Sequence, residues 1–293
     1  MITINRFDIT ALEDNLTKAA QKCPAPDGPF REPKYVNYVS GVKEWNGITY
    51  FTDKLLHLAP EINSKIKIGI LMEPPELLPY IYDVIQQYEE HYDLIFTYAY
   101  ELLEKNPSKY KFFPADIAAI EDPSCKMHQK TKLVSMIYSD KTQLQGHQLR
   151  HIIAKTFLPG IGYDKVDFFG KGTDHPIHYK SEGCNDYMFQ IAVENAQRKD
   201  YFADKILDCF ITGVIPIYWG CPNIGNYFDE RGILSFNNFN QLKEIMQSLS
   251  EEKYKSMLEY AEKNYEIAKT KYMNSDDYLY EKVVEHLNVE FVE

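Results

Sequence analysis

The sequence predicts an α/β protein made of two domains with a cleft between them. Two blocks in which short apolar runs alternate with helical patterns, one on each side of residue 130, support this prediction. Strands that alternate with helices are typical of a parallel sheet covered by helices, and a length of 293 residues suits two such domains. Ligands of these sheets bind beyond the carboxyl ends of the strands, so we expect the functional site there.

The first block is expected to form an N-terminal domain of residues 1–130. Its first 45 residues or so are expected to be irregular, because four prolines and a glycine lie between residues 24 and 33. The expected strands are 48–52, 65–72 and 94–98, with a helix over 77–90. Residues 99–130 contain three more prolines and are expected to be a loop.

The second block is expected to form a C-terminal domain of residues 131–275. The expected strands are 133–138, 166–169, 187–193 and 214–219, and the expected helices are 146–157, 201–212, 242–249 and 251–273. Gly213 stands where a residue with positive φ would end the second of these helices. A last helix within residues 276–293 is expected to return toward the first domain.

The composition excludes several classes of protein. A net charge of −11 and the lack of a Lys/Arg-rich block argue against nucleic acid and anionic membranes as partners. The five cysteines are odd in number and form no Cys-x-x-Cys pair, so neither a disulfide framework nor a zinc site is indicated. The N-terminus resembles no signal peptide, and the longest apolar stretch, 209–219, is too short to span a bilayer. We therefore expect a soluble, cytoplasmic protein, and its oligomeric state stays open.

The segment 189–228 carries the strongest functional signal, because it reads as a strand, a polar loop, a helix and a second strand. The loop leads into the first turn of the helix, where free amide groups and the helix dipole attract anions. Lys205 lies in this turn, the unfavourable end for a cation, so it is either an exposed lysine or the partner of a bound anion. Asp200 fits a helix N-cap, and Asp204 fits either a first-turn acid or an acceptor for a ribose diol.

The same segment resembles the signature of the α-1,3-fucosyltransferases, glycosyltransferase family 10. It carries, in the order and spacing of that family, Phe189, Val193-Glu194-Asn195-Ala196, Asp200-Tyr201-Phe202-Ala203-Asp204-Lys205, residues 213–220 (GVIPIYWG) and Pro222-Asn223-Ile224. The resemblance continues in the strand 132–139, which is followed by a helix with a basic residue, Arg150, and in Met72-Glu73-Pro74-Pro75. It implies two Rossmann-like domains that face a cleft, the GT-B type of fold, and a soluble member of the bacterial or viral kind.

The resemblance also implies an activity and a set of site residues. The activity is the inverting transfer of L-fucose from GDP-fucose to a hydroxyl of an acceptor glycan, as in glycan biosynthesis and protein glycosylation. Glu73 would be the general base that deprotonates the acceptor hydroxyl. The donor-binding residues would be Arg150, Glu194, Asn195, Tyr201, Asp204 and Lys205. Arg150 and Lys205 would neutralise the donor diphosphate, so no metal and no cofactor would be required.

Alternatives remain at several of these positions. Glu73 also fits a solvated loop acid, and Arg150 a surface helix residue. Asp204, Val193 and Ala196 depart from the Glu, Phe and Ser usual in the family, which leaves open another donor, such as GDP-mannose or a UDP-sugar, or a non-catalytic glycan- or nucleotide-binding protein. His175 and His178 have no third ligand nearby, and His147 and His151 lack the glutamate of a zinc motif, although one of the latter pair could face the donor diphosphate.

Overall fold

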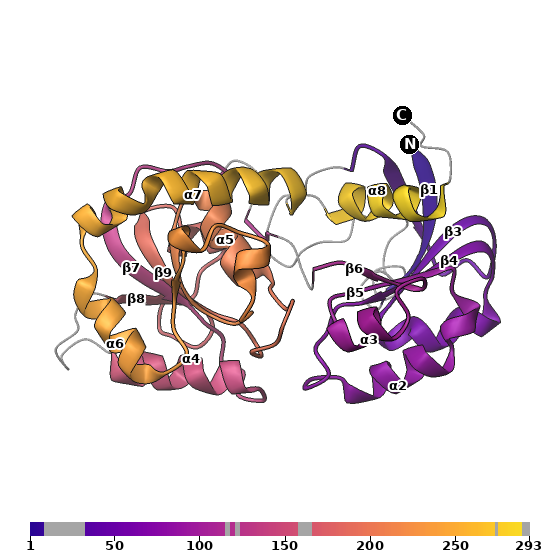
Figure 1. Ribbon diagram of the computed structural model, residues 1–293, viewed down its shortest axis with the longest axis horizontal. Coiled ribbons are helices and arrows are strands. Elements are labelled where there is room, and N and C mark those ends of the chain that lie inside the picture. The colour runs from indigo at the N-terminus through magenta and orange to yellow at the C-terminus, as the bar shows by residue number, and fades with distance from the viewer. Residues whose placement is uncertain (9–32, 115–117, 121–123, 158–165, 273–274, 289–293) are drawn as a thin grey trace. The chain divides into compact units, whose positions relative to one another are not determined.

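The computed structural model describes residues 1–8, 33–114, 118–120, 124–157, 166–272 and 275–288. These residues form two compact units (Figure 1). The first unit contains residues 1–8, 33–114 and 275–288, and the second contains the rest of the described chain. The boundary between the units therefore lies between residues 114 and 118, earlier in the chain than the expected boundary after residue 130.

The first unit is built on a six-stranded sheet in which every neighbouring pair is parallel. Its strands are β1 (Ile2–Phe7), β2 (Val36–Ser40), β3 (Glu44–Thr52), β4 (Asn63–Leu71), β5 (Leu94–Thr97) and β6 (Tyr110–Phe112), in the order β2-β1-β3-β4-β5-β6. The three predicted strands are confirmed as β3, β4 and β5. The expectation of irregular structure was wrong for β1 and β2, and the expectation of a loop over 99–130 was wrong for β6 and the helix α3 (Tyr100–Lys105).

Helices cover both faces of this sheet (Figure 1). The 3₁₀ helix η1 (Asp53–Glu61) and the helix α2 (Pro79–Gln87) pack on one face, where they meet Phe51 of β3, and a further 3₁₀ turn, η2 (Glu89–His91), follows α2. The C-terminal helix α8 (Ser275–Leu287) packs on the other face, where it meets Tyr50 of the same strand. Alternate residues of β3 thus point to opposite cores, as strand geometry requires. The last helix therefore belongs to the first unit.

The second unit is built on a five-stranded parallel sheet. Its strands are β7 (Lys132–Ile137), β8 (Val166–Phe169), β9 (Tyr187–Val193), β10 (Ile215–Trp219) and β11 (Leu234–Ser235), in the order β11-β10-β9-β7-β8. The four predicted strands of this block are confirmed. All seven residues of the central strand β9 are buried, as expected for a strand that helices cover on both sides.

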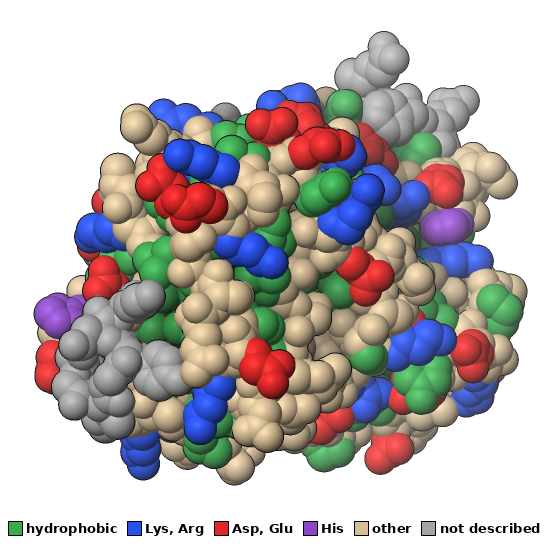
Figure 2. Space-filling view, turned by 60° about the vertical axis from the view of Figure 1, so that its left-hand side comes forward, with side chains coloured by type: hydrophobic (Ala, Val, Ile, Leu, Met, Phe, Trp, Pro, Cys, Tyr) green, Lys and Arg blue, Asp and Glu red, His purple; other side chains and the backbone are tan. Residues whose placement is uncertain are grey.

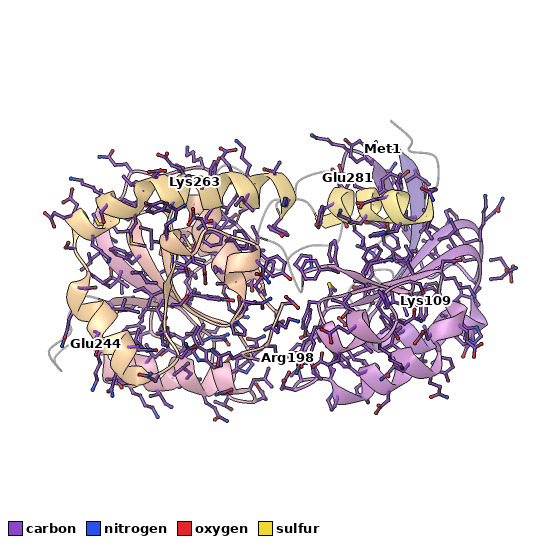
Figure 3. The ribbon with its side chains drawn as sticks, viewed as in Figure 1. Met1, Lys109, Arg198, Glu244, Lys263 and Glu281 are labelled. Carbon is purple, nitrogen blue, oxygen red and sulfur yellow. The ribbon has the colours of Figure 1, made fainter. Side chains whose placement is uncertain are left out.

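The helices of the second unit lie above and below the sheet in Figure 1, with α7 on one side and α4 on the other. The elements are α4 (Gln145–Thr156), η4 (Lys180–Gly183), α5 (Asp204–Thr212), η5 (Ile224–Asn226), η6 (Glu230–Gly232), α6 (Phe239–Ser248) and α7 (Glu251–Lys271). Gly213 ends α5 with a φ of 74°, as predicted. On the solvent side of α7, Lys263 pairs with Glu259 one turn away at 2.6 Å (Figure 3).

The start of α5 differs from the expectation in a way that affects the site. The helix begins at Asp204 rather than at residue 201, and its N-cap is Ala203. Asp200, the expected N-cap, has a φ of 64° and accepts hydrogen bonds from Asn223 and Tyr227. Its carboxylate therefore holds a loop in a conformation that L-residues other than Asn and Asp rarely adopt.

Basic and acidic side chains are interspersed over the face drawn in Figure 2. The described residues that are visible there form no continuous basic area of the kind that binds nucleic acid. No helix in the described part of the chain is both long enough and apolar enough to cross a membrane.

Candidate functional site

A cavity of about 300 Å³ lies in the second unit, beyond the carboxyl ends of three neighbouring strands. Tyr138 follows β7, Gly170 follows β8 and Asn195 follows β9, and all three residues line the cavity. The first turns of α4 and α5 complete it with His147 and Lys205. Ligands of parallel sheets bind at this edge, so the cavity has the predicted location.

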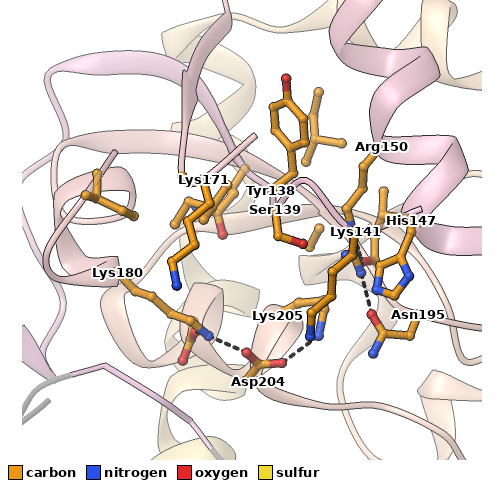
Figure 4. Close-up of a pocket in the computed structure, with 18 residues that line it drawn as sticks. Tyr138, Ser139, Lys141, His147, Arg150, Lys171, Lys180, Asn195, Asp204 and Lys205 are labelled. Atoms are coloured by element: carbon orange, nitrogen blue, oxygen red, sulfur yellow. Dashed lines mark hydrogen bonds and ion pairs between the residues drawn. The ribbon is translucent and has the colours of Figure 1, made fainter. Parts of the chain in front are cut away.

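The cavity is strongly basic although the protein is acidic (Figure 4). Its charged lining consists of Lys141, Arg150, Lys171, Lys180 and Lys205 with two acids, Asp204 and Asp208. A local excess of cations in a protein with a net charge of −11 favours the binding of an anion there. The start of α5 adds the positive end of a helix dipole to the same place.

Asp204 sits between two lysines at the first position of α5. Its Oδ1 accepts from Lys205 Nζ at 2.7 Å, and its Oδ2 accepts from Lys180 Nζ. Lys180 also donates to Asp208 Oδ2 at 2.9 Å, one helical turn further on. Only 18% of the Asp204 side chain is exposed, so water screens these ion pairs less than it screens surface pairs.

Burial and charge act against each other on these groups. Burial alone would raise the pKa of Asp204, but the ammonium groups of Lys180 and Lys205 lower it far below its ordinary value. Burial would likewise lower the pKa of Lys205, yet Asp204 and Glu194 raise it. Both lysines therefore stay charged at neutral pH, which a phosphate-binding site requires.

Arg150 is a buried residue of α4 whose guanidinium faces the end of β9. Its Nε and Nη2 donate to the carbonyl oxygen of Val193 at 2.9 and 2.6 Å, and Nη2 also donates to Asn195 Oδ1 at 2.8 Å. Only 5% of Arg150 is exposed. Its alternative reading as a surface residue was therefore wrong, and it fixes Asn195 as well as bringing a charge to the cavity.

Glu194 lies beneath the cavity and is fully buried. Its Oε1 accepts from the backbone N–H of Ala203 at 3.0 Å, and its Oε2 lies 3.6 Å from Lys205 Nζ. Burial raises the pKa of this carboxyl, whereas Lys205 lowers it. Glu194 thus ties the end of β9 to the start of α5, and it does not line the cavity itself.

Tyr201 is buried, with 2% of its surface exposed, and is not among the residues that line the cavity. It follows Asp200, whose backbone N–H donates to Asn223 Oδ1 at 2.8 Å and whose Oδ1 accepts from Tyr227 at 2.7 Å. The Pro-Asn-Ile motif therefore stabilises the structure, because Asn223 binds Asp200 in the loop that contains Tyr201 and precedes α5.

Glu73 lies in the first unit, two residues after β4 ends at Leu71. Its backbone N–H donates to Asp53 Oδ1 at 3.2 Å, and the N–H of Met72 donates to the same atom at 2.9 Å. The carbonyl oxygen of Glu73 accepts from Tyr82 at 3.0 Å. Three hydrogen bonds thus hold the backbone around the expected base. Asp53 has a φ of 36°, and burial raises its pKa to about 6.

The sequence reasoning missed several residues of the cavity. Lys141, Lys171 and Lys180 reach it from loops and from η4, and single lysines in loops carry no sequence signal. A signal for Lys180 did exist, because Asp204 and Asp208 are four residues apart on one face of a largely buried helix and need a cation nearby. Among the described residues, no group of three or more His, Cys, Asp or Glu side chains could hold a metal ion.

Comparisons with known proteins identify the family of this chain. A family model described as glycosyltransferase family 10 (fucosyltransferase), C-terminal part, matches residues 127–280. An alpha-(1,3)-fucosyltransferase FucT of Helicobacter pylori is 32% identical over 70 residues, which make up 24% of this chain and 15% of that protein. Alpha-(1,3)-fucosyltransferase B of Drosophila melanogaster is 34% identical over 67 residues, 22% of this chain and 15% of that protein.

Solved structures show the same fold. The chain is similar to an alpha1,3-fucosyltransferase crystallised with GDP, with a TM-score of 0.54 at 13% identity over 99% of this chain and 91% of that one. It is also similar to TarM, with a TM-score of 0.55 at 14% identity over 83% of this chain and 55% of that one. The fold class is therefore the two-unit α/β architecture of GT-B glycosyltransferases, as predicted. Because the family model covers more than half of the chain, this protein belongs to glycosyltransferase family 10, the fucosyltransferase family.

Proposed function

We propose that this protein transfers L-fucose from GDP-fucose to a hydroxyl group of an acceptor glycan. The observation that supports this most strongly is the basic cavity at the start of α5, where five cations line the same space as Asn195 and Asp204 of the family signature. A nucleoside diphosphate carries the negative charge that this cavity lacks. An alpha1,3-fucosyltransferase of the same fold has been crystallised with GDP-fucose, which favours this donor.

In the proposed reaction the acceptor oxygen attacks the anomeric carbon of fucose while the bond from that carbon to the diphosphate breaks. The configuration inverts because a single displacement takes place. Glu73 takes the proton of the acceptor hydroxyl, and GDP leaves with the bonding electrons. Lys205, Arg150 and the helix dipole stabilise the charge that develops on the diphosphate, a role that often supplies most of the catalysis.

Asp204 is shorter than the glutamate usual in the family, but it can still bind the donor. Its two carboxylate oxygens are held by Lys180 and Lys205, and each oxygen has a second lone pair that can accept from a ribose hydroxyl. We propose that Asn195, held by Arg150, binds the donor beside it. Glu194 and Tyr201 then act by holding the loop between β9 and α5 rather than by lining the cavity.

The test combines donor binding with turnover. Thermal shift with GDP, UDP and ADP identifies the nucleotide, since a ligand at 100 times its Kd adds about 2.7 kcal/mol to the free energy of unfolding. GDP-fucose, GDP-mannose and UDP-sugars are then incubated with a panel of acceptor glycans and with the variants Glu73→Gln and Glu76→Gln. Glu76 is an exposed acid three residues after Glu73 and serves as the control. We expect fucosyl transfer that is lost in Glu73→Gln and kept in Glu76→Gln. Full activity of Glu73→Gln would show that Glu73 is not the general base. Stabilisation by UDP alone would show that the donor is a UDP-sugar rather than GDP-fucose.

A further inference from the structure

One buried side chain of the cavity has no place in the proposed mechanism so far. His147 lies in the first turn of α4, is 4% exposed, and lines the cavity beside Arg150 and Asn195 (Figure 4). Its alternative, a purely structural histidine, would have both ring nitrogens engaged within the protein. Among the residues that the structure describes, only one ring nitrogen of His147 has a hydrogen-bond partner.

The hydrogen bond to Nδ1 determines the tautomer of the His147 ring. The backbone N–H of Leu144 donates to Nδ1 of His147 at 3.2 Å, as the third helical residue does in a capping box. A backbone N–H can only donate, so Nδ1 must carry a lone pair and the proton of the neutral ring must lie on Nε2. Nε2 has no hydrogen-bond partner among the residues that the structure describes.

The surroundings keep this ring neutral. The pKa of His147 is lowered to about 4, and burial of the ring is the largest cause. The charges of Arg150, Lys141 and Lys205 lower it further, and His151 makes a smaller contribution. At neutral pH the cavity therefore contains an N–H donor without a charge among several cations. Such a donor suits a ligand atom that only accepts hydrogen bonds, as phosphate oxygens do at this pH.

We propose that His147 donates a hydrogen bond from its Nε2–H to a phosphate oxygen of the nucleoside diphosphate. This inference rests on the proposed function, because it takes the ligand of the cavity to be a nucleotide donor. The neutral ring adds a fixed donor to the leaving diphosphate without increasing the repulsion among Lys141, Arg150 and Lys205. His147 thus binds the nucleotide-sugar through its diphosphate rather than through the sugar or the base.

The test compares two substitutions by isothermal titration with GDP and with guanosine. His147→Gln keeps an acceptor for the Leu144 N–H and places an amide N–H where Nε2–H was, whereas His147→Met keeps neither. We expect His147→Met to bind GDP about tenfold or more weakly than wild type, the loss typical of one hydrogen bond to a charged group. Guanosine affinity should be unchanged in both variants, and His147→Gln should recover most of the GDP affinity.

A matched control and the contrary outcomes complete the experiment. Gln148→Ala, on the exposed side of the same turn, should bind GDP like wild type. Unaltered GDP binding by His147→Met, an equal loss for guanosine, or no recovery in His147→Gln would each overturn the proposal. The melting temperature of each variant, measured in parallel, separates a lost helix cap from a lost ligand contact. If wild type itself binds no GDP, that result contradicts the proposed function. The two His147 variants would then show no GDP binding either, which distinguishes this case from a failure of the His147 proposal alone.

Discussion

Lys180 donates to the buried carboxylate of Asp208 at 2.9 Å, although 28 positions separate the two residues in the chain. The same ammonium group also pairs with Asp204. Burial first, and then Asp204, raise the pKa of Asp208, against the opposing effect of Lys180. One lysine from η4 therefore pairs with two acids of α5 at the edge of the candidate donor site.

Removing this lysine is expected to destabilise the second unit. Lys180→Met leaves the Asp208 carboxylate without its cation, and a lost partner of a buried ion pair costs about 3–5 kcal/mol. Chemical denaturation should show this loss, and a second substitution, Asp208→Asn, should recover part of it. Lys171→Met, which removes an exposed lysine of the same cavity, should leave the unfolding midpoint unchanged. Equal midpoints for Lys180→Met and Lys171→Met would show that the pair contributes nothing.

A second prediction concerns the support of Glu73. Asp53→Ala removes the acceptor for the N–H groups of Met72 and Glu73, and it places alanine at a positive φ. Because a small misplacement of a catalytic group is costly, we expect kcat to fall at least about tenfold with the KM for the donor unchanged. Asp53→Asn keeps an acceptor and tolerates this φ, so it should retain most of the activity. A rise in the donor KM instead would place the effect in nucleotide binding.

A third prediction follows from the close approach of α4 to the end of β9. A Cβ on Gly146 would lie 1.7 Å from the carbonyl oxygen of Glu194, and the Gly146 N–H donates to the carbonyl oxygen of Asn195 at 3.0 Å. Alanine normally stabilises a helix relative to glycine by about 0.5–1 kcal/mol. Here Gly146→Ala should instead destabilise by about 1–3 kcal/mol and weaken GDP binding, since the loop must move. A stabilised variant with intact GDP affinity would contradict the observed packing.

A fourth prediction is a dependence of stability on pH. The folded state holds His147 neutral, with a pKa of about 4, whereas the unfolded chain protonates it near pH 6.5. Because the unfolded state then binds more protons, the free energy of unfolding should fall as pH drops from about 6.5 to 4. Relative to His147→Gln, wild type should lose roughly 2–3 kcal/mol over this range. Parallel pH profiles for the two proteins would show that the ring is not held neutral.

The sequence predicted the main framework because that framework depends on local patterns. The apolar runs of β4, β7, β9 and β10 and the glycine after α5 were sufficient to place the strands and to locate the loop that opens into the cavity. The strands β1 and β2 were missed because prolines between them suggested irregular structure, although the strands themselves contain none. Their parallel pairing across many residues leaves no local signal.

The candidate site was predicted in part for a similar reason. Asn195, Asp204 and Lys205 belong to one continuous segment, so their spacing could be recognised directly. The start of α5 was placed three residues too early because Asp200 is a good N-cap by residue type, while its actual partners are Asn223 and Tyr227. Lys180 reaches Asp204 from a distant segment, and the tautomer of His147 depends on its hydrogen bond with the Leu144 N–H, so only the folded structure shows them.

The central claim is that a guanine nucleotide binds through its diphosphate at the start of α5. Calorimetric titration of GDP into wild type, Lys205→Gln and Lys199→Gln tests it most directly. We predict saturable binding by wild type and at least about tenfold weaker binding by Lys205→Gln. Lys199→Gln removes an exposed charge from the loop before α5, and it should bind GDP like wild type. Absence of GDP binding by wild type at millimolar concentration, or equal affinities of all three proteins, would contradict the claim.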